Sequence, residues 1–313
     1  MGEGVSSTMN VLILGAGGRT GTALIPMMLD ETDASLTLVS RQAILSSDPR
    51  ITSVEADITD RTTLKDIVMS TLPDAVINLA AMTNVDRCET DKNECWQLNV
   101  TLIENLTRFC RAADAHLVHV STDYVFDGLR GPYVEQDTPN PLSYYGKSKL
   151  ASENIVSSSG IDAAIVRTNV IYGPSPDHPD FVRFVLQSID QDRPINAASD
   201  QYSNPTYVDD IADALIRIVR KRRTGMYHVG GRDYMSRYEF AVAIAETFKL
   251  PTTLINAVTT ESLNLPARRP LRGGLISLKA EADLGMQMTG VTAGLVTLRH
   301  KLFQRASPAA NKT

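Results

Sequence analysis

The glycine-rich segment 15–21 constrains the fold most, because of what lies on both sides of it. An apolar run at 11–14, of the kind found in buried strands, leads directly into Gly-Ala-Gly-Gly-Arg-Thr-Gly, and a helix-compatible stretch follows. Gly15, Gly18 and Gly21 allow a tight turn and a close approach to a pyrophosphate, whose charge is favoured at a helix N-terminus. Their spacing, Gly-x-x-Gly-x-x-Gly, differs from the dinucleotide fingerprint Gly-x-Gly-x-x-Gly. The segment predicts a strand, a phosphate loop and a helix.

Further apolar runs follow the glycine segment, and most are separated by enough residues for a helix. They lie at 36–39, 51–54, 75–79, 117–120 and 161–168. Strands that alternate with helices are typical of a parallel sheet covered on both faces. We therefore expect an α/β fold: a Rossmann-type doubly wound parallel sheet, accompanied by a smaller α/β lobe.

The chain is expected to divide after residue 168. Residues 1–168 would form an NAD(P)-binding Rossmann domain, to which an amphipathic helix and a strand at about 206–230 return. Residues 169–313 would form the C-terminal substrate-binding lobe, which is discontinuous because of this return. Its first part, 169–205, is rich in Pro, Asp and Ser. Helices at 237–249 and 291–303 would complete the lobe.

Composition excludes several classes of protein. The 313 residues are 43% hydrophobic and 21% charged with a net charge of -5, which argues against disorder and against a nucleic-acid partner. Cys88, Cys95 and Cys110 show no Cys-x-x-Cys spacing, so the sequence predicts neither a disulfide framework nor a metal site and favours a cytoplasmic location. No apolar run has transmembrane length, which argues against a membrane partner. Residues 1–8 are expected to be a leader, and 307–311 a frayed tail.

Tyr145 and Lys149 lie four residues apart at the start of an expected helix, with Ser143 as its N-cap. At this spacing the two side chains share a helical face. A nearby ammonium favours the phenolate and lowers the pKa of a tyrosine, so Tyr145 could act as a general acid or base. On this pattern alone, the alternative that Tyr145 packs in the core and Lys149 is solvated stays open.

Small and polar residues follow two central strands. Ala80 and Ala81 follow the run at 75–79, where a cofactor could lie close to the backbone, and Ser121-Thr122-Asp123-Tyr124 follows the run at 117–120. Open parallel sheets bind ligands at the carboxyl ends of their strands. We therefore expect this polar cluster and the helix of Tyr145 to converge.

The residues after the second strand bear on cofactor choice. A site that prefers NAD usually carries an acidic residue there, whereas this chain has Ser40 and Arg41. Arg41 can pair with a 2'-phosphate, so NADP(H) is preferred and NAD(H) remains possible. The alternative is a solvated loop arginine. Asp57, after the third strand, is placed for the adenine edge.

Several motifs together resemble those of the extended short-chain dehydrogenase/reductase family, and within it the dTDP-4-dehydrorhamnose reductases. Besides the glycine loop, they are Ser-Thr-Asp-Tyr-Val-Phe-Asp-Gly at 121–128 and Tyr-Gly-Lys-Ser-Lys at 145–149. The likeness continues through Asn-Leu-Ala-Ala-Met-Thr-Asn-Val-Asp at 78–86 and further short motifs: Arg167-Thr168, Asp200-Gln201-Tyr202, Pro205-Thr206 and Arg269-Pro270. It covers nearly the whole chain.

The resemblance implies an NADPH-dependent reductase of a nucleotide-activated 4-keto-6-deoxy sugar, with a catalytic triad of Thr122, Tyr145 and Lys149. Tyr145 would protonate the ketone oxygen while the nicotinamide delivers hydride to the carbon, and Lys149 would also bind the nicotinamide ribose. The expected cofactor-binding residues are Gly15, Gly18, Arg19, Thr20, Gly21, Ser40, Arg41, Asp57, Ile58, Ala80, Ala81, Met82, Tyr145 and Lys149. The expected substrate-binding residues are Thr83, Val85, Asp86, Thr122, Asp123, Tyr124, Asn169 and Val170.

Four positions depart from related enzymes. Tyr124 replaces the glutamate of sugar-nucleotide 4,6-dehydratases, which disfavours dehydration. Asn169 and Val170 stand where the rhamnose-forming reductases carry Ser-Trp, which leaves the sugar open. Ala23 stands where a glutamate supports a metal-bridged dimer in some members. A metal-bridged homodimer is therefore in doubt, whereas a homodimer of another type stays open.

Two other functions remain compatible with these motifs. A nucleotide-sugar epimerase would retain its cofactor and show no net oxidation. The regulatory beta subunit of methionine adenosyltransferase is similar to the same reductases, including the Asp-Tyr-Val-Phe-Asp-Gly run, and it binds NADP and a partner enzyme without this chemistry.

Overall fold

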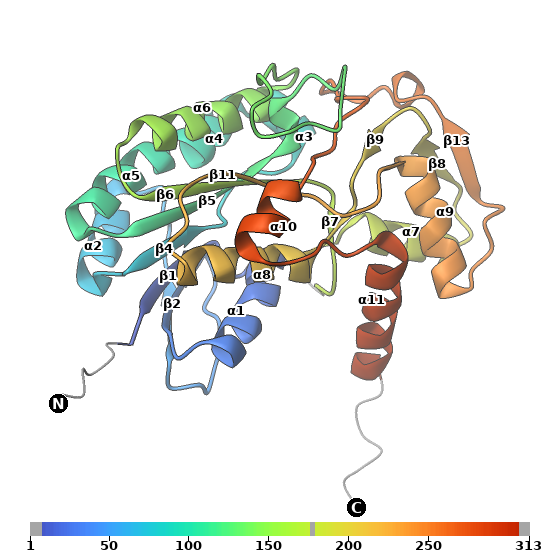
Figure 1. Cartoon of the computed structure of the whole chain (residues 1–313). Coiled ribbons are helices and arrows are strands. Elements are labelled where there is room, and N and C mark those ends of the chain that lie inside the picture. The colour runs from blue at the N-terminus through green and yellow to red at the C-terminus, as the bar shows by residue number, and fades with distance from the viewer. Residues whose placement is uncertain (1–7, 176–178, 307–313) are drawn as a thin grey trace, which may run out of the picture.

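Residues 8–175 and 179–306 are described by the computed structural model, and within them seven parallel strands form one central sheet (Figure 1). The strand order is β11-β6-β5-β4-β1-β2-β3. This order confirms the predicted Rossmann-type doubly wound fold. The expected leader, apart from residue 8, and the expected tail lie outside the described residues. The strands are β1 (Asn10–Leu14), β2 (Ser35–Ser40), β3 (Ile51–Glu55), β4 (Ala75–Asn78), β5 (His116–Thr122), β6 (Ala163–Thr168) and β11 (Gly225–Val229).

Helices cover both faces of the sheet. On one face lie α1 (Arg19–Glu31), α8 (Val208–Arg220) and α10 (Leu278–Leu284), and on the other lie α2 (Arg61–Thr71), α5 (Leu102–Ala113) and α6 (Tyr144–Ser158). Alternate residues of β1 serve the two layers: Val11 and Ile13 pack toward α1 and α8, whereas Leu12 and Leu14 pack toward α2 and α5. Burial on both faces explains why the strands read as continuous apolar runs.

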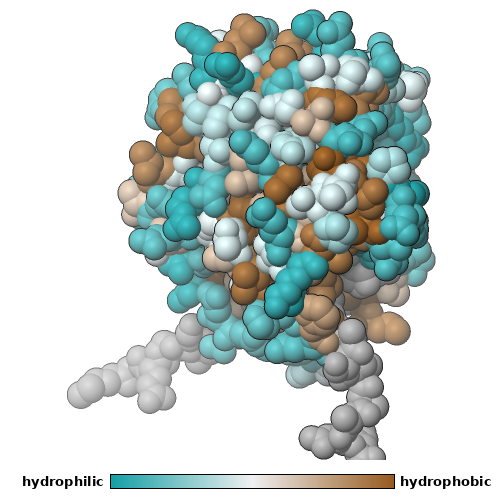
Figure 2. All heavy atoms as spheres, turned by 90° about the vertical axis from the view of Figure 1, so that its right-hand side faces the viewer, coloured by the Kyte–Doolittle hydropathy of each residue, from teal (hydrophilic) through white to brown (hydrophobic). Residues whose placement is uncertain are grey.

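The remaining elements form a smaller lobe with its own apolar cluster. Its helices are α7 (Phe181–Asp190), α9 (Arg237–Phe248) and α11 (Val291–Ala306). Three two-stranded pairs accompany them within the described residues: β7 (Ile171–Tyr172) with β10 (Thr206–Tyr207), β8 (Ile195–Ala198) with β13 (Ile255–Val258), and β9 (Tyr202–Ser203) with β12 (Met235–Ser236). Figure 2 views the molecule from the side of this lobe and shows hydrophilic and hydrophobic residues mixed across that face. The domain boundary at residue 168 stays a prediction.

Short helical turns link the larger elements on the α5 side. They are α3 (Val85–Thr90), α4 (Lys92–Trp96) and a π-helical turn at Gln97–Thr101 that runs directly into α5. The 3-10 turns Asp123–Val125 and Glu261–Leu263 are shorter, with three residues each. Among the described residues, no helix is both long and apolar enough to cross a membrane.

The glycine loop owes its shape to two close approaches. Gly15 has φ +74, and a Cβ atom there would lie 2.7 Å from the backbone nitrogen of Ala80. Gly21 lies in the first turns of α1, where a Cβ atom would be 2.0 Å from the carbonyl oxygen of Ala16. Backbone atoms cannot yield as a side chain can, so both positions require glycine.

We predict that Gly21→Ala destabilises the protein by about 1–3 kcal/mol, because α1 must move away from the backbone of Ala16 to accommodate the methyl group. Gly17→Ala is the matched control from the same loop, since its Cβ would meet only the Ser40 side chain, at 3.4 Å. The midpoint of urea unfolding measures both effects. Equal midpoints for the two variants would show that the loop tolerates a side chain at Gly21.

Candidate active site

The carboxyl end of β5 places a polar cluster at the edge of the sheet. Thr122 and Asp123 are buried, and Thr122 Oγ1 accepts a hydrogen bond from the backbone nitrogen of Tyr124 at 3.2 Å. Asp123 Oδ2 accepts hydrogen bonds from Asn169 Nδ2 at 3.1 Å and from the Gly274 backbone nitrogen at 3.2 Å. Burial raises the pKa of Asp123, and these hydrogen bonds oppose the rise. Asp123 therefore joins β5 to segments that follow β6 and precede α10.

Tyr145 reaches this cluster from the first turn of α6. Ser143 caps the helix as predicted, because its Oγ accepts a hydrogen bond from the Gly146 backbone nitrogen at 3.1 Å. The Tyr145 side chain is 8% exposed and meets Tyr124 edge to face, with ring centroids 5.8 Å apart. Burial raises the pKa of Tyr145, although a hydrogen bond with Thr122 works in the opposite direction. The phenol is therefore held protonated at neutral pH.

The expected lowering of the tyrosine pKa by Lys149 is wrong for this structure. Lys149 is 2% exposed, and its Nζ donates a hydrogen bond to the carbonyl oxygen of Val120 at 2.8 Å. Its other close polar neighbour among the described residues is His119 Nε2, at 3.3 Å. Burial lowers the pKa of Lys149 to about 8, opposed by the nearby Glu153 carboxylate. Lys149 is thus buried rather than solvated, and its ammonium donates to Val120 of β5 instead of to the Tyr145 phenol.

A buried ion pair lies below these residues. Arg167 of β6 pairs with Glu153 of α6 at 2.7 Å, and the two side chains are 3% and 2% exposed. Ser121 Oγ donates to Glu153 Oε1 at 2.6 Å, while the Arg167 guanidinium lies over the ring of Phe126 at 5.0 Å. Arg167 also lies 3.3 Å from His228 Nε2 through Nη1. The pair fixes α6 against β5 and β6.

Two arginines that were not assigned a role in the sequence lie beside this cluster. Arg269 Nη2 bonds Asp86 Oδ2 at 2.6 Å, and its Nη1 is a buried nitrogen without a hydrogen-bond partner in the described chain. The Arg237 guanidinium, from the start of α9, lies 5.0 Å from the centroid of the Phe181 ring. Burial raises the pKa of Tyr124, and the charges of Arg269 and Arg237 oppose that rise. In the sequence, the one signal for either arginine is that Arg269 belongs to the Arg269-Pro270 motif.

The other expected substrate residues lie in different settings. Thr83 is exposed, whereas Val85 packs partly against the apolar group around Tyr145. Asn169 is buried and accepts a hydrogen bond from Thr206 Oγ1 at 3.0 Å. Val170 has φ +40, which is a strained conformation for a β-branched residue. The strain falls where the chain leaves β6 for the smaller lobe.

The other expected cofactor residues lie near the adjacent strand ends and at the start of α1. Gly18 is the N-cap of α1 and offers no side-chain acceptor to its first turn, which suits a phosphate. Arg19 instead holds the smaller lobe: its Nη1 pairs with Asp180 at 2.7 Å. Thr20, Ala80 and Ala81 are partly buried, and Ile58 and Met82 are buried.

Arg41 and its neighbours occupy the ends of β2 and β3. Arg41 is exposed, and Ser40 Oγ donates a hydrogen bond to the carbonyl oxygen of Gln42, so this hydroxyl is already engaged. Hydrogen bonds from Thr59 lower the pKa of Asp57, and the charge of Arg41 contributes in the same direction. Arg41 and Asp57 therefore share one corner of the sheet edge.

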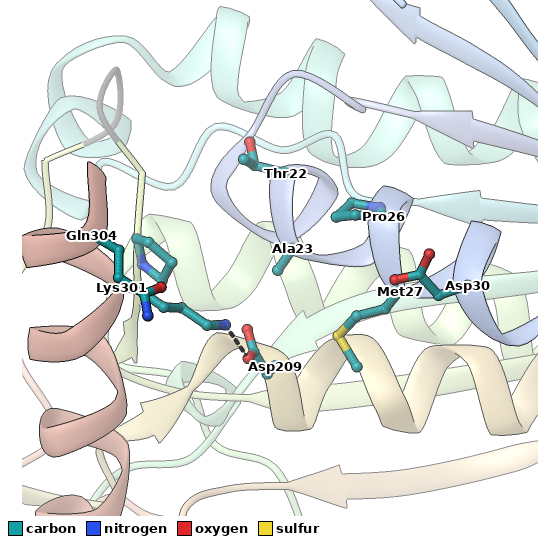
Figure 3. Close-up of a pocket in the computed structure, with 9 residues that line it drawn as sticks. Thr22, Ala23, Pro26, Met27, Asp30, Asp209, Lys301 and Gln304 are labelled. Atoms are coloured by element: carbon teal, nitrogen blue, oxygen red, sulfur yellow. Dashed lines mark hydrogen bonds and ion pairs between the residues drawn. The ribbon is translucent and has the colours of Figure 1, made fainter. Parts of the chain in front are cut away.

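A cavity of about 400 Å³ lies elsewhere, between α1, the start of α8 and α11 (Figure 3). Lys301 pairs with Asp209 at 2.6 Å in this cavity. Ala23, which also lines it, has no carboxylate with which to bridge a metal. None of the lining residues is an expected site residue. Across the described ranges, no group of three or more His, Cys, Asp or Glu residues is arranged to hold a metal ion.

Known proteins are similar to nearly the whole chain. Residues 9–302 match the family described as RmlD substrate binding domain. A dTDP-4-dehydrorhamnose reductase from Aggregatibacter actinomycetemcomitans is 32% identical over 92% of this chain and 98% of its own. The beta subunit of methionine adenosyltransferase 2 from Rattus norvegicus is 31% identical over 87% of this chain and 81% of its own.

A solved structure agrees with the sequence comparison. The crystal structure of dTDP-4-dehydrorhamnose reductase from Bacillus anthracis in complex with NADP has a TM-score of 0.82 and 26% identity, covering 94% of this chain and 99% of that one. The likeness thus extends through the central sheet and the smaller lobe together. The resemblance read from the motifs is confirmed, and the chain belongs to the RmlD substrate binding domain family.

Proposed function

We propose that this protein is an NADPH-dependent reductase of a nucleotide-activated 4-keto-6-deoxy sugar, similar to dTDP-4-dehydrorhamnose reductases. The observation that carries the proposal is the buried, protonated phenol of Tyr145 beside Thr122 at the carboxyl end of β5. A ketone oxygen that gains negative charge needs hydroxyl donors at that place. The reductase relative and the NADP-bound neighbour support the same reaction class.

Each residue of the triad has a role that suits its surroundings. Tyr145 donates its proton to the ketone oxygen, and its raised pKa keeps the proton in place until the oxygen becomes basic. Thr122 donates a second hydrogen bond to the same oxygen. Lys149 holds the cofactor ribose with the N–H groups that Val120 does not occupy. The bound cofactor supplies the hydride.

The glycine loop and the strand ends suit NADPH. The loop approaches Ala80 so closely that only glycine fits at position 15, which leaves a cradle for a pyrophosphate above the N-terminus of α1. Arg41 is the exposed cation at the end of β2, where it can bind a 2'-phosphate. NADPH is therefore the preferred cofactor.

The arginines near Tyr124 suit the anionic part of the substrate. Arg237 and Arg269 both act electrostatically on Tyr124, and Arg269 Nη1 has no partner among the described residues. A diphosphate offers two charges and several acceptors to such a pair. Val170, in place of a large aromatic ring, leaves more room at the sugar.

A regulatory role is the second candidate, because the methionine adenosyltransferase subunit is nearly as similar as the reductase. Both the reductase and the regulatory function require NADP binding, so cofactor affinity does not distinguish them. The polar Thr122–Tyr145 arrangement favours chemistry. An epimerase would use the same residues but consume no cofactor.

Turnover of NADPH with a keto sugar distinguishes these candidate functions. We expect the purified protein to oxidise NADPH in the presence of dTDP-4-keto-6-deoxy sugars, with one product molecule formed for each NADPH consumed. The loss of nicotinamide absorbance measures this oxidation. Cofactor binding without oxidation across a panel of sugar nucleotides would favour the regulatory role.

Tyr145→Phe keeps the ring in its packing position and removes the proton donor. The hydride step should slow about 10²- to 10⁴-fold, the usual range for a lost general acid, while NADPH affinity hardly changes. Single-turnover rates at saturating NADPH measure the step. Tyr144→Phe, which alters the neighbouring phenol whose ring centroid lies 6.3 Å from that of Trp96, is the matched control and should react at the unmutated rate. Rapid reduction by Tyr145→Phe would remove the tyrosine from the mechanism.

Arg41→Ala should abolish most of the preference for NADPH over NADH, because it removes the cation available to the 2'-phosphate. Titration of both cofactors gives the ratio of dissociation constants. Arg108→Ala, which removes an exposed charge on α5, should leave the ratio unchanged. If the unmutated protein binds both cofactors equally well, Arg41 has no such role.

A further inference from the structure

His119 is fully buried on β5, and its ring nitrogens lie near polar atoms from two other elements, β4 and α6. Its Nδ1 lies 3.1 Å from Asn78 Nδ2 of β4, and its Nε2 lies 3.0 Å from Ser152 Oγ and 3.3 Å from Lys149 Nζ, both of α6. Asn78 and His119 face each other directly in the parallel register of β4 and β5. The imidazole therefore sits between the end of β4 and the lysine of the triad.

The donors around the ring determine which nitrogen carries the hydrogen. Asn78 Oδ1 accepts from the Ala80 backbone nitrogen at 3.3 Å, which turns the amide nitrogen of Asn78 toward His119. Nδ1 of His119 is then an acceptor, and because burial and the charge of Lys149 hold the pKa of His119 well below its usual range, the ring carries a single hydrogen, on Nε2.

The hydrogen bonds then run in one direction. His119 Nε2–H donates to Ser152 Oγ, and Ser152 in turn donates to the carbonyl oxygen of Lys149 at 2.7 Å. Nε2 has no lone pair left for the ammonium, although Lys149 Nζ is only 3.3 Å away. Val120 O is therefore the one acceptor that the described residues offer to this ammonium at close range.

We propose that His119 is a positioning residue for Lys149. Asn78 holds His119 as the Nε2–H tautomer, which cannot accept a hydrogen bond from the Lys149 ammonium. Two of the three N–H groups of Lys149 are thereby left for the cofactor ribose. A ring that accepted from Lys149 would instead draw the ammonium toward β5. This inference rests on the proposed function in one respect, that Lys149 binds the cofactor.

The proposal predicts how cofactor affinity depends on pH. Ammonium donors are lost as the pH rises through the pKa of Lys149, which burial lowers to about 8, so NADPH affinity should fall across that range. The titratable groups facing Lys149 are Glu153 and Tyr145 on its own helix, Cys95 on α4 and His119 on β5. Variants that change only His119 or Asn78 leave the other three in place.

His119→Gln is the central test, because a glutamine oxygen can accept from Lys149 where the Nε2–H group cannot. The acceptor stabilises the ammonium, so the pH midpoint for loss of NADPH affinity should rise by about one unit. At pH 7 the affinity should fall roughly ten-fold, because one N–H group is diverted from the ribose. Fluorescence titration of NADPH across pH 6–10 measures both.

His116→Gln is the matched control. His116 is also a buried histidine of β5, but three residues away it faces the other side of the sheet, where its Nε2 meets the Arg223 carbonyl oxygen at 2.8 Å. His116→Gln should lose about as much thermal stability as His119→Gln, but it should keep the NADPH affinity and the pH midpoint of the unmutated protein. A structural role alone would give His119→Gln the same result as this control.

Histidine nitrogen NMR of the cofactor-free protein tests the tautomer directly. The signal that disappears in His119→Gln should belong to an Nε2–H ring that stays neutral between pH 5 and 8. Asn78→Asp should convert it to the Nδ1–H form, because a carboxylate accepts there, and should also raise the midpoint. An Nδ1–H ring in the unmutated protein, or an unchanged midpoint in His119→Gln, overturns the proposal. If the unmutated protein reduces no keto sugar, the proposed function fails while these measurements still decide the role of His119.

Discussion

The geometry of the site depends on the buried ion pair between Glu153 and Arg167. Both groups lie in the interior, where an unpaired charge costs several kcal/mol, so neither can move without its partner. Glu153 is one helical turn beyond Lys149, and Arg167 lies in the strand next to β5. The pair therefore sets how α6 crosses the carboxyl ends of β5 and β6, and with it where Tyr145 points.

The central sheet could be predicted from the sequence because each of its strands is buried on both faces. Runs such as Val11-Leu12-Ile13-Leu14 are apolar throughout, and Gly15 and Gly21 mark the turn that follows. The smaller lobe gave weaker signals. Its strands β7, β9, β10 and β12 have two residues each, which is too short for any periodicity, and α10 spans only seven residues.

The site was predictable where spacing along one element determines contact. Tyr145 and Lys149 share a face of α6, and Ser143 caps that helix, as their positions in the sequence indicated. Electrostatics was not predictable in this way. The pKa of Tyr145 is raised rather than lowered, because burial outweighs other effects and the Lys149 ammonium bonds to Val120. Such a result depends on packing between distant segments.

Packing between distant segments also explains why the motifs gave no role to some residues near the site. Arg237, at the start of α9, comes near Tyr124 only through the packing of the smaller lobe, and His119 meets Lys149 only through the packing of α6 on the sheet. His119 stands out in the sequence merely as a histidine within an apolar strand, which fits a satisfied core residue equally well. The role that we propose for His119 follows from the direction of the hydrogen bonds around its ring.

We propose that hydride reduction takes place at the Thr122–Tyr145 cluster at the end of β5. The most direct measurement uses NADPH deuterated at the transferable position of the nicotinamide, together with a nucleotide-activated 4-keto-6-deoxy sugar, and locates the label in the product by NMR. We expect one deuterium on the carbon that carried the ketone, and a solvent-derived proton on its oxygen. A product without deuterium at that carbon, or cofactor that stays unoxidised with every sugar nucleotide offered, would contradict this proposal.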